Sequence, residues 1–144
     1  MKKRSRVDNL VAPHRMVIAE RRLEVSSRSS RRPVTVRFLR PELEAKPAGV
    51  WICVYEIRGL PGRRRIIRAV PGVDEVQALI GALQGVRQDL RVQQEDGVEL
   101  TWEGQSDLGF PSLVEDEATT AEWRKGKYPP PRLSEFPIYP LPED

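Results

Sequence analysis

The sequence is poor in the residues that most enzymes use for chemistry. Its 144 residues include one cysteine, Cys53, and one histidine, His14. A single cysteine excludes an internal disulfide, and a zinc site, which needs three or four ligands, would be short of its usual residues. A nucleophile with a histidine base would have to use His14, which lies near the N-terminus. We therefore expect no catalytic residue, no metal and no cofactor, and we expect that the protein is not an enzyme.

Long apolar runs and phosphate-binding loops are also lacking. No stretch approaches the ~18 apolar residues of a membrane helix, and residues 1–6 are basic without the apolar stretch of a secretory signal. No G-x-x-x-x-G-K-[ST] loop is present. Aromatic residues make up 6% of the chain, which is little for stacking on single-stranded nucleic acid. These features predict a cytoplasmic protein without membrane contact.

Charge is abundant and unevenly divided. Residues 1–68 hold 18 Lys and Arg against 6 Asp and Glu, whereas residues 69–144 hold 6 against 15, so the net charge of +3 divides into +12 and −9. Such asymmetry indicates either a basic nucleic-acid surface beside an acidic tail or two parts that neutralise each other in the fold. We favour the second interpretation, because isolated basic residues in strands usually form a solvated face.

Alternating apolar and polar residues predict strands over much of the chain. The alternation indicates half-buried strands at 16–25 and 34–38, joined through the serine- and arginine-rich loop 26–32. Residues 41–49 contain two prolines and a glycine and are expected to form a loop. Residues 50–57 are apolar on both faces, which places them at the centre of the sheet. A fourth strand at 63–70 returns from the turn at 59–62, and a fifth follows at 98–102.

An amphipathic helix is predicted after Pro71-Gly72. Asp74 and Gln77 have the spacing of a capping box. Gly81 and Gly85 each cost about 1 kcal/mol relative to alanine, which suggests that the helix lies close to the sheet there. Seven apolar residues at three- and four-residue steps form the stripe that we expect to face the sheet: Val73, Val76, Leu79, Ile80, Leu83, Val86 and Leu90.

The order β-β-β-β-α-β predicts an α+β fold, a four- to five-stranded antiparallel sheet with one amphipathic helix packed on one face. We divide the chain into a basic flexible arm at 1–14, an α+β domain at 15–112 and an acidic, proline-rich tail at 113–144. Within the tail, residues 115–125 are expected to form a short helix. Six of 13 prolines lie within 129–142, a composition that favours extended polyproline II over a strand.

Several short motifs give the central region a family resemblance. Residues 18–23 (IAERRL), 51–60 (WICVYEIRGL), 72–79 (GVDEVQAL), 100–102 (LTW) and 107–111 (DLGFP) occur in this order. Together they resemble a small bacterial domain family of unknown function, over roughly residues 16–111. Before the helix this chain has Val70-Pro71-Gly72 in place of an aromatic-glycine pair, so its helix entry is expected to differ. The resemblance implies domain boundaries and no activity.

Arginines provide the first candidate binding site. Two loops or turns that an antiparallel sheet would bring to one region carry Arg28, Arg31, Arg32, Arg63, Arg64 and Arg65. Guanidinium groups suit bidentate contacts to phosphate and to carboxylate. No helix-turn-helix or RNA-binding signature accompanies them. They are therefore candidates for binding a protein or, as the alternative, a nucleic acid.

The tail provides the second candidate site through Tyr128, Phe136 and Tyr139. A preformed extended segment with aromatic anchors can dock in a groove of a partner at low entropic cost. The other interpretation is that the tail packs along its own domain and covers an open edge strand. The sequence as a whole favours a non-catalytic protein-binding module of adaptor or immunity type, with an arginine-mediated nucleic-acid binder as the alternative.

Overall fold

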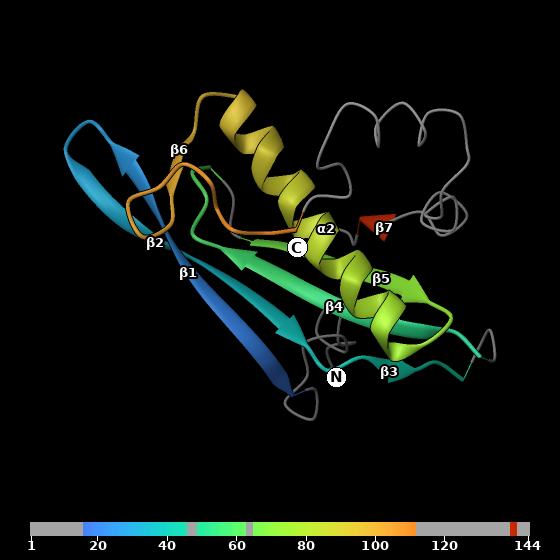
Figure 1. Ribbon diagram of the computed structural model, residues 1–144. Helices are drawn as coiled ribbons and strands as arrows, with labels where there is room; N and C mark the ends of the chain where they lie inside the picture. Colours follow the sequence, from blue (N-terminus) through green and yellow to red (C-terminus); the bar gives the residue numbers. More distant parts are fainter. Residues whose placement is uncertain (1–15, 46–48, 63–64, 112–138, 141–144) are drawn as a thin grey trace, which may run out of the picture.

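The computed structural model describes residues 16–45, 49–62, 65–111 and 139–140 (Figure 1). Seven strands form one antiparallel sheet in the order β6-β1-β2-β4-β5-β7, with β3 paired to β4 beside this path. The bounds are β1 Val17–Ser27, β2 Ser30–Leu39, β3 Glu42–Leu43, β4 Trp51–Arg58, β5 Arg65–Gly72, α2 Glu75–Glu95, β6 Glu99–Thr101 and β7 Tyr139–Pro140. The predicted α+β class is confirmed.

Helix α2 crosses one face of the sheet over β4 and β5 (Figure 1). Strand β4 lies inside the sheet between β2 and β5, as its apolar sequence predicts, and Cys53, Tyr55 and Ile57 on its helix side are fully buried. The main core lies between this face and the helix. A smaller apolar cluster, formed by Leu39, Val54 and Ile67 with Ile52 and Ala69 beside them, lies on the opposite face, which we call the outer face.

The helix begins as its sequence predicts. The Asp74 carboxylate accepts a hydrogen bond from the Gln77 backbone N–H at 2.7 Å, and the Gln77 side-chain oxygen accepts one from the Val73 N–H at 2.7 Å. The first bond satisfies the Gln77 N–H, which the first turn leaves unpaired, and the second ties Gln77 back to Val73, the residue before the N-cap Asp74.

The face of α2 that packs on the sheet differs from the predicted stripe. Small residues make the closest contact, among them Ala78, Ala82 and Gly85, together with Val86 and Leu90. A Cβ atom at Gly85 would lie 2.9 Å from both Cε1 and the hydroxyl oxygen of Tyr55, so only glycine leaves room for this ring. The prediction that glycine brings the helix close to the sheet holds here. The close packing at glycine also explains why the predicted apolar stripe is rotated away from the sheet. Val73, Val76 and Ile80 are exposed, and Leu79 and Leu83 lie partly buried at the border of the main core.

Two short strands form where the sequence predicted none. Strand β3 lies in the expected loop 41–49, where Glu42 pairs with Ile52 and Leu43 with Trp51. Strand β7 lies in the proline-rich tail, and its residues Tyr139 and Pro140 pair with Ala69 and Arg68. The predictions of a loop at 41–49 and of an unpaired extended tail relied on local composition alone. An exposed strand edge offers free backbone N–H and C=O groups, so an extended segment beside it can pair whatever its composition. The helix expected at 115–125 lies outside the described residues.

Candidate functional site

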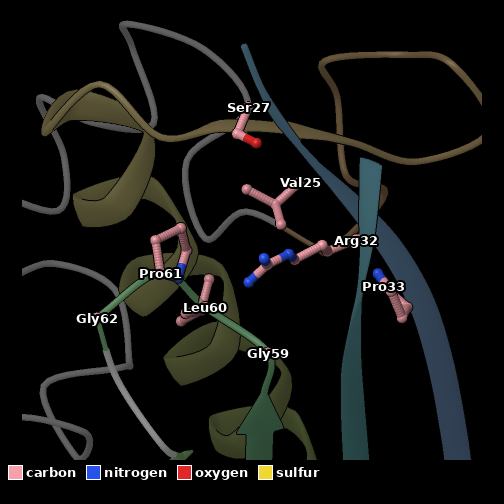
Figure 2. A pocket seen from close by; sticks show the side chains of 8 residues that line it. All are labelled: Val25, Ser27, Arg32, Pro33, Gly59, Leu60, Pro61 and Gly62. Carbon is pink, nitrogen blue, oxygen red and sulfur yellow. The ribbon is translucent and has the colours of Figure 1, made fainter. Parts of the chain in front are cut away.

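A groove of about 720 Å³ opens at the end of the sheet where the β1–β2 hairpin meets the turn after β4. Apolar side chains from both elements line much of it, and Arg32 is the charged residue among them (Figure 2). Figure 2 shows the Arg32 side chain extending from β2 across the opening toward Leu60 and Pro61. The described residues that line the groove are Val25, Ser27, Arg32, Pro33, Gly59, Leu60, Pro61 and Gly62.

The groove is held by backbone contacts between its two walls. In the hairpin, Val25 pairs with Arg32, and the Ser27 hydroxyl lies 3.3 Å from the carbonyl oxygen of Ser30, to which it donates. In the opposite wall, Gly59 has a φ of +97°, and a Cβ atom there would collide with the Pro33 carbonyl oxygen. Both the conformation and the close approach therefore require glycine. The floor is the end of the main core, since Val25 and Leu60 are buried.

The predicted arginine cluster is only partly brought together. Arg28 in the hairpin turn and Arg32 in the groove are exposed, and neither has a carboxylate partner among the described residues. Arg31 and Arg65 instead belong to the outer face. Arg31 lies 3.8 Å from the Glu24 carboxylate, and both side chains are exposed.

Arg65 belongs to a buried charge cluster on the outer face. The Glu56 side chain is only 5% exposed, and its carboxylate lies 2.6 Å from Arg58 Nε and 3.6 Å from Arg65 Nη1. A buried carboxylate needs such partners because the loss of hydration is otherwise uncompensated. Arg65 therefore has a structural role that sequence spacing alone did not reveal.

The remaining predicted residues are placed as follows. Arg63, Arg64, Tyr128 and Phe136 lie outside the described residues. Tyr139 lies in β7 beside Ala69, so at this point the tail pairs with an edge strand of its own domain.

A second polar cluster, which the sequence did not predict, lies between α2 and the sheet. Asp89 on the helix accepts hydrogen bonds from the Tyr55 hydroxyl at 2.5 Å and from Arg68 Nε and Nη2 at 2.6 Å each. Burial, followed by the nearby negative charge of Asp89, raises the pKa of Tyr55 well above its usual range. The hydrogen bond to Asp89 raises the pKa of Arg68. The phenol therefore stays protonated and the guanidinium charged, which fits a structural anchor rather than acid–base chemistry.

Three of the sequence motifs meet in a clamp around Arg21. Its guanidinium carbon lies 4.0 Å from the ring centroid of Trp102 and 4.7 Å from that of Phe110. Its Nη1 donates to the carbonyl oxygens of Leu108 at 3.1 Å and Gly109 at 2.7 Å. The IAERRL, LTW and DLGFP motifs thus come together to hold the chain after β6 against β1.

Cys53 is fully buried in β4, and burial raises the pKa of its thiol to about 12. In the unfolded chain the thiol ionises near pH 9, so above this pH the unfolded state loses a proton that the native state keeps. We expect the free energy of unfolding to fall as the pH rises from about 9 toward 12, with Cys53 contributing about 1.4 kcal/mol per pH unit. Urea titrations at pH 8, 9 and 10 should show a smaller fall for Cys53→Ala, and an equal fall would contradict this assignment.

Among the described residues, no three or more His, Cys, Asp and Glu side chains gather as metal ligands would. No helix in the same part of the chain is long and apolar enough to cross a membrane.

The fold and groove define a small α+β domain, in which one helix packs on one face of an antiparallel sheet. Residues 19–112, more than half of the chain, match the family model described as Domain of unknown function (DUF6968), and the chain belongs to this family. The resemblance predicted from the sequence motifs is thereby confirmed. No curated protein and no solved structure matches the chain.

Proposed function

We propose that this domain is a non-catalytic module that binds another protein through the groove between the β1–β2 hairpin and the turn at 59–62. The observation that carries the proposal is the lining of the groove, which combines apolar Val25, Leu60 and Pro61 with an exposed arginine, Arg32, that has no carboxylate partner among the described residues. An apolar side chain fits the floor, and a carboxylate beside it would meet the guanidinium. The partner is therefore expected to present an apolar residue next to an aspartate or glutamate.

Electrostatics support a protein partner over a nucleic acid. Of the arginines at this end of the sheet, Arg31 and Arg65 already have the carboxylate partners Glu24 and Glu56. No aromatic side chain is among the described residues that line the groove, so bases have no stacking platform there. An arginine-mediated nucleic-acid binder is the alternative, and salt-dependent binding of a duplex would distinguish it from a protein-binding module. Cys53 is buried and forms no disulfide, which fits a reducing compartment. We therefore place the interaction in the cytoplasm.

A displayed library of random peptides tests the proposal with defined ligands. We expect selection on the purified full chain to enrich peptides with Leu, Ile or Phe next to Asp or Glu. Arg32→Glu should weaken binding of an enriched peptide at least about tenfold, as loss of a charge-assisted contact predicts. Arg22→Glu is the matched control, because Arg22 lies in neighbouring β1 and is likewise exposed.

Two outcomes would contradict the proposal. One is that no peptide is enriched, and the other is that enriched peptides bind the Arg32→Glu and wild-type proteins equally. A labelled DNA or RNA duplex at about 50 and about 200 mM salt tests the alternative, because phosphate contacts weaken steeply with salt. Salt-dependent duplex binding that Arg32→Glu abolishes, without peptide binding, would establish the nucleic-acid function instead.

A further inference from the structure

The N-terminal half of helix α2 presents an apolar surface that carries no charge. Residues 76–86 are eleven consecutive residues of the helix without Asp, Glu, Lys or Arg. On the side away from the sheet, Val76 is 64% exposed, Ile80 46%, and Val73, which precedes the helix, 48%. We call these three residues the α2 strip. The solvent side of a surface helix is normally polar or charged, whereas an exposed apolar patch depleted of charge is typical of an interface.

The two ends of the α2 strip carry opposite charges. Asp74 and Glu75 lie at its start, and Arg87 lies just beyond its end. Arg87 Nη1 donates to the Phe110 carbonyl oxygen at 2.7 Å, and this exposed guanidinium has no carboxylate partner among the described residues. Asp74 lies six residues before Ile80 and Arg87 seven residues after it, about 10 Å along the helix in either direction. The surface is therefore complementary to a copy of itself turned end to end.

We infer that the α2 strip binds a second copy of this chain, with the two α2 helices packed antiparallel about a two-fold axis near Ile80. The Ile80 side chains of the two copies meet at the axis, and Val76 packs beside Leu83 across it. Arg87 of each copy lies next to Asp74 of the other, where a charge-assisted contact can form. Antiparallel packing also places opposite ends of the two helix dipoles side by side.

The size of the surface sets the strength of this dimer. Eleven helical residues extend about 16 Å, so the interface is small and the dimer is expected to dissociate readily. The inference does not depend on the proposed function, because the groove is formed by the β1–β2 hairpin and the turn at 59–62 and shares no residue with the α2 strip.

Sedimentation equilibrium of the full chain tests the inference. We expect a monomer–dimer equilibrium with a dissociation constant of about 1–100 µM. Val76→Asp should raise this constant at least about thirtyfold, because dimerisation would then bury two carboxylates without partners. Val92→Asp is the matched control, since Val92 is 42% exposed on the same helix but lies about three turns beyond Ile80. It should change the constant by less than about threefold.

A cross-link tests the register of the two helices. In a Cys53→Ala background, Ile80→Cys should form a disulfide between two copies under mild oxidation, because the two positions meet at the axis. Val92→Cys should form little, since the same axis separates its two copies by about 36 Å along the helices. The cross-link decides the matter if circular dichroism shows that Val76→Asp has not folded.

A chain that stays monomeric at about 100 µM overturns the inference, whatever else covers the α2 strip. Equal weakening of the dimer by Val76→Asp and Val92→Asp also overturns it, because the interface would then lie elsewhere. So does a dimer in which Val92→Cys cross-links as fully as Ile80→Cys.

Discussion

Replacement of Asp89 by alanine should lower the free energy of unfolding by about 3 kcal/mol, the largest loss expected for a single polar side chain in this domain. The Asp89 carboxylate accepts three hydrogen bonds, one from Tyr55 and two from Arg68. Its side chain is 13% exposed and that of Arg68 is 22% exposed, so water replaces these bonds poorly. The variant leaves a phenol and a guanidinium without their acceptor between helix and sheet. Urea denaturation followed by circular dichroism measures the loss.

The exposed pair Arg91 and Glu95 on the same helix provides the control. Its nitrogen–oxygen distance of 3.0 Å is comparable, but the two side chains are 65% and 63% exposed. Glu95→Ala should therefore cost no more than about 0.5 kcal/mol. Tyr55→Phe, which removes only the hydroxyl, should fall between the two at about 1 kcal/mol. Similar losses for Asp89→Ala and Glu95→Ala would show that the cluster between helix and sheet is not an anchor.

Replacement of Arg21 by alanine should destabilise the domain by about 2–3 kcal/mol. The variant loses two charge-assisted hydrogen bonds to backbone carbonyls and the contacts with the rings of Trp102 and Phe110. Because the lost contacts hold residues 108–110, hydrogen exchange should increase in this segment more than in β4. Arg22 is the control, since it neighbours Arg21 but is exposed, and Arg22→Ala should change stability by less than about 0.5 kcal/mol. Equal effects of the two variants would contradict the clamp.

The parts of the fold that the sequence predicted best are those with a regular local pattern. Alternation indicated β1 and β2, the doubly apolar run placed β4 inside the sheet, and the Asp74 and Gln77 spacing indicated the helix start. The prediction of which face of α2 packs on the sheet was wrong. It relied on the spacing of large apolar residues, whereas close packing against the Tyr55 ring requires Gly85 and its small neighbours.

The candidate site was less predictable for a different reason. Turn residues predicted that two arginine-bearing loops would lie at one end of the sheet. The hairpin residue Arg32 does line a groove with the turn at 59–62, whereas Arg63 and Arg64 of that second loop lie outside the described residues. Which arginine remains free depends on carboxylates distant in sequence, such as Glu56 for Arg65. The same holds for Arg68 and Asp89, which are 21 positions apart and meet only after the helix has packed. No local pattern contains this information.

The close contact of Gly59 with Pro33 has a consequence for how a ligand would be selected. One wall of the groove rests on the backbone of the other at Gly59, so the spacing of the two walls at this point is set by the backbone. Binding would then require little rearrangement of the protein, so its entropic cost falls mainly on the ligand. Changes at Arg32 would alter the charge at the opening that its side chain crosses, while the backbone contact between Gly59 and Pro33 stays the same.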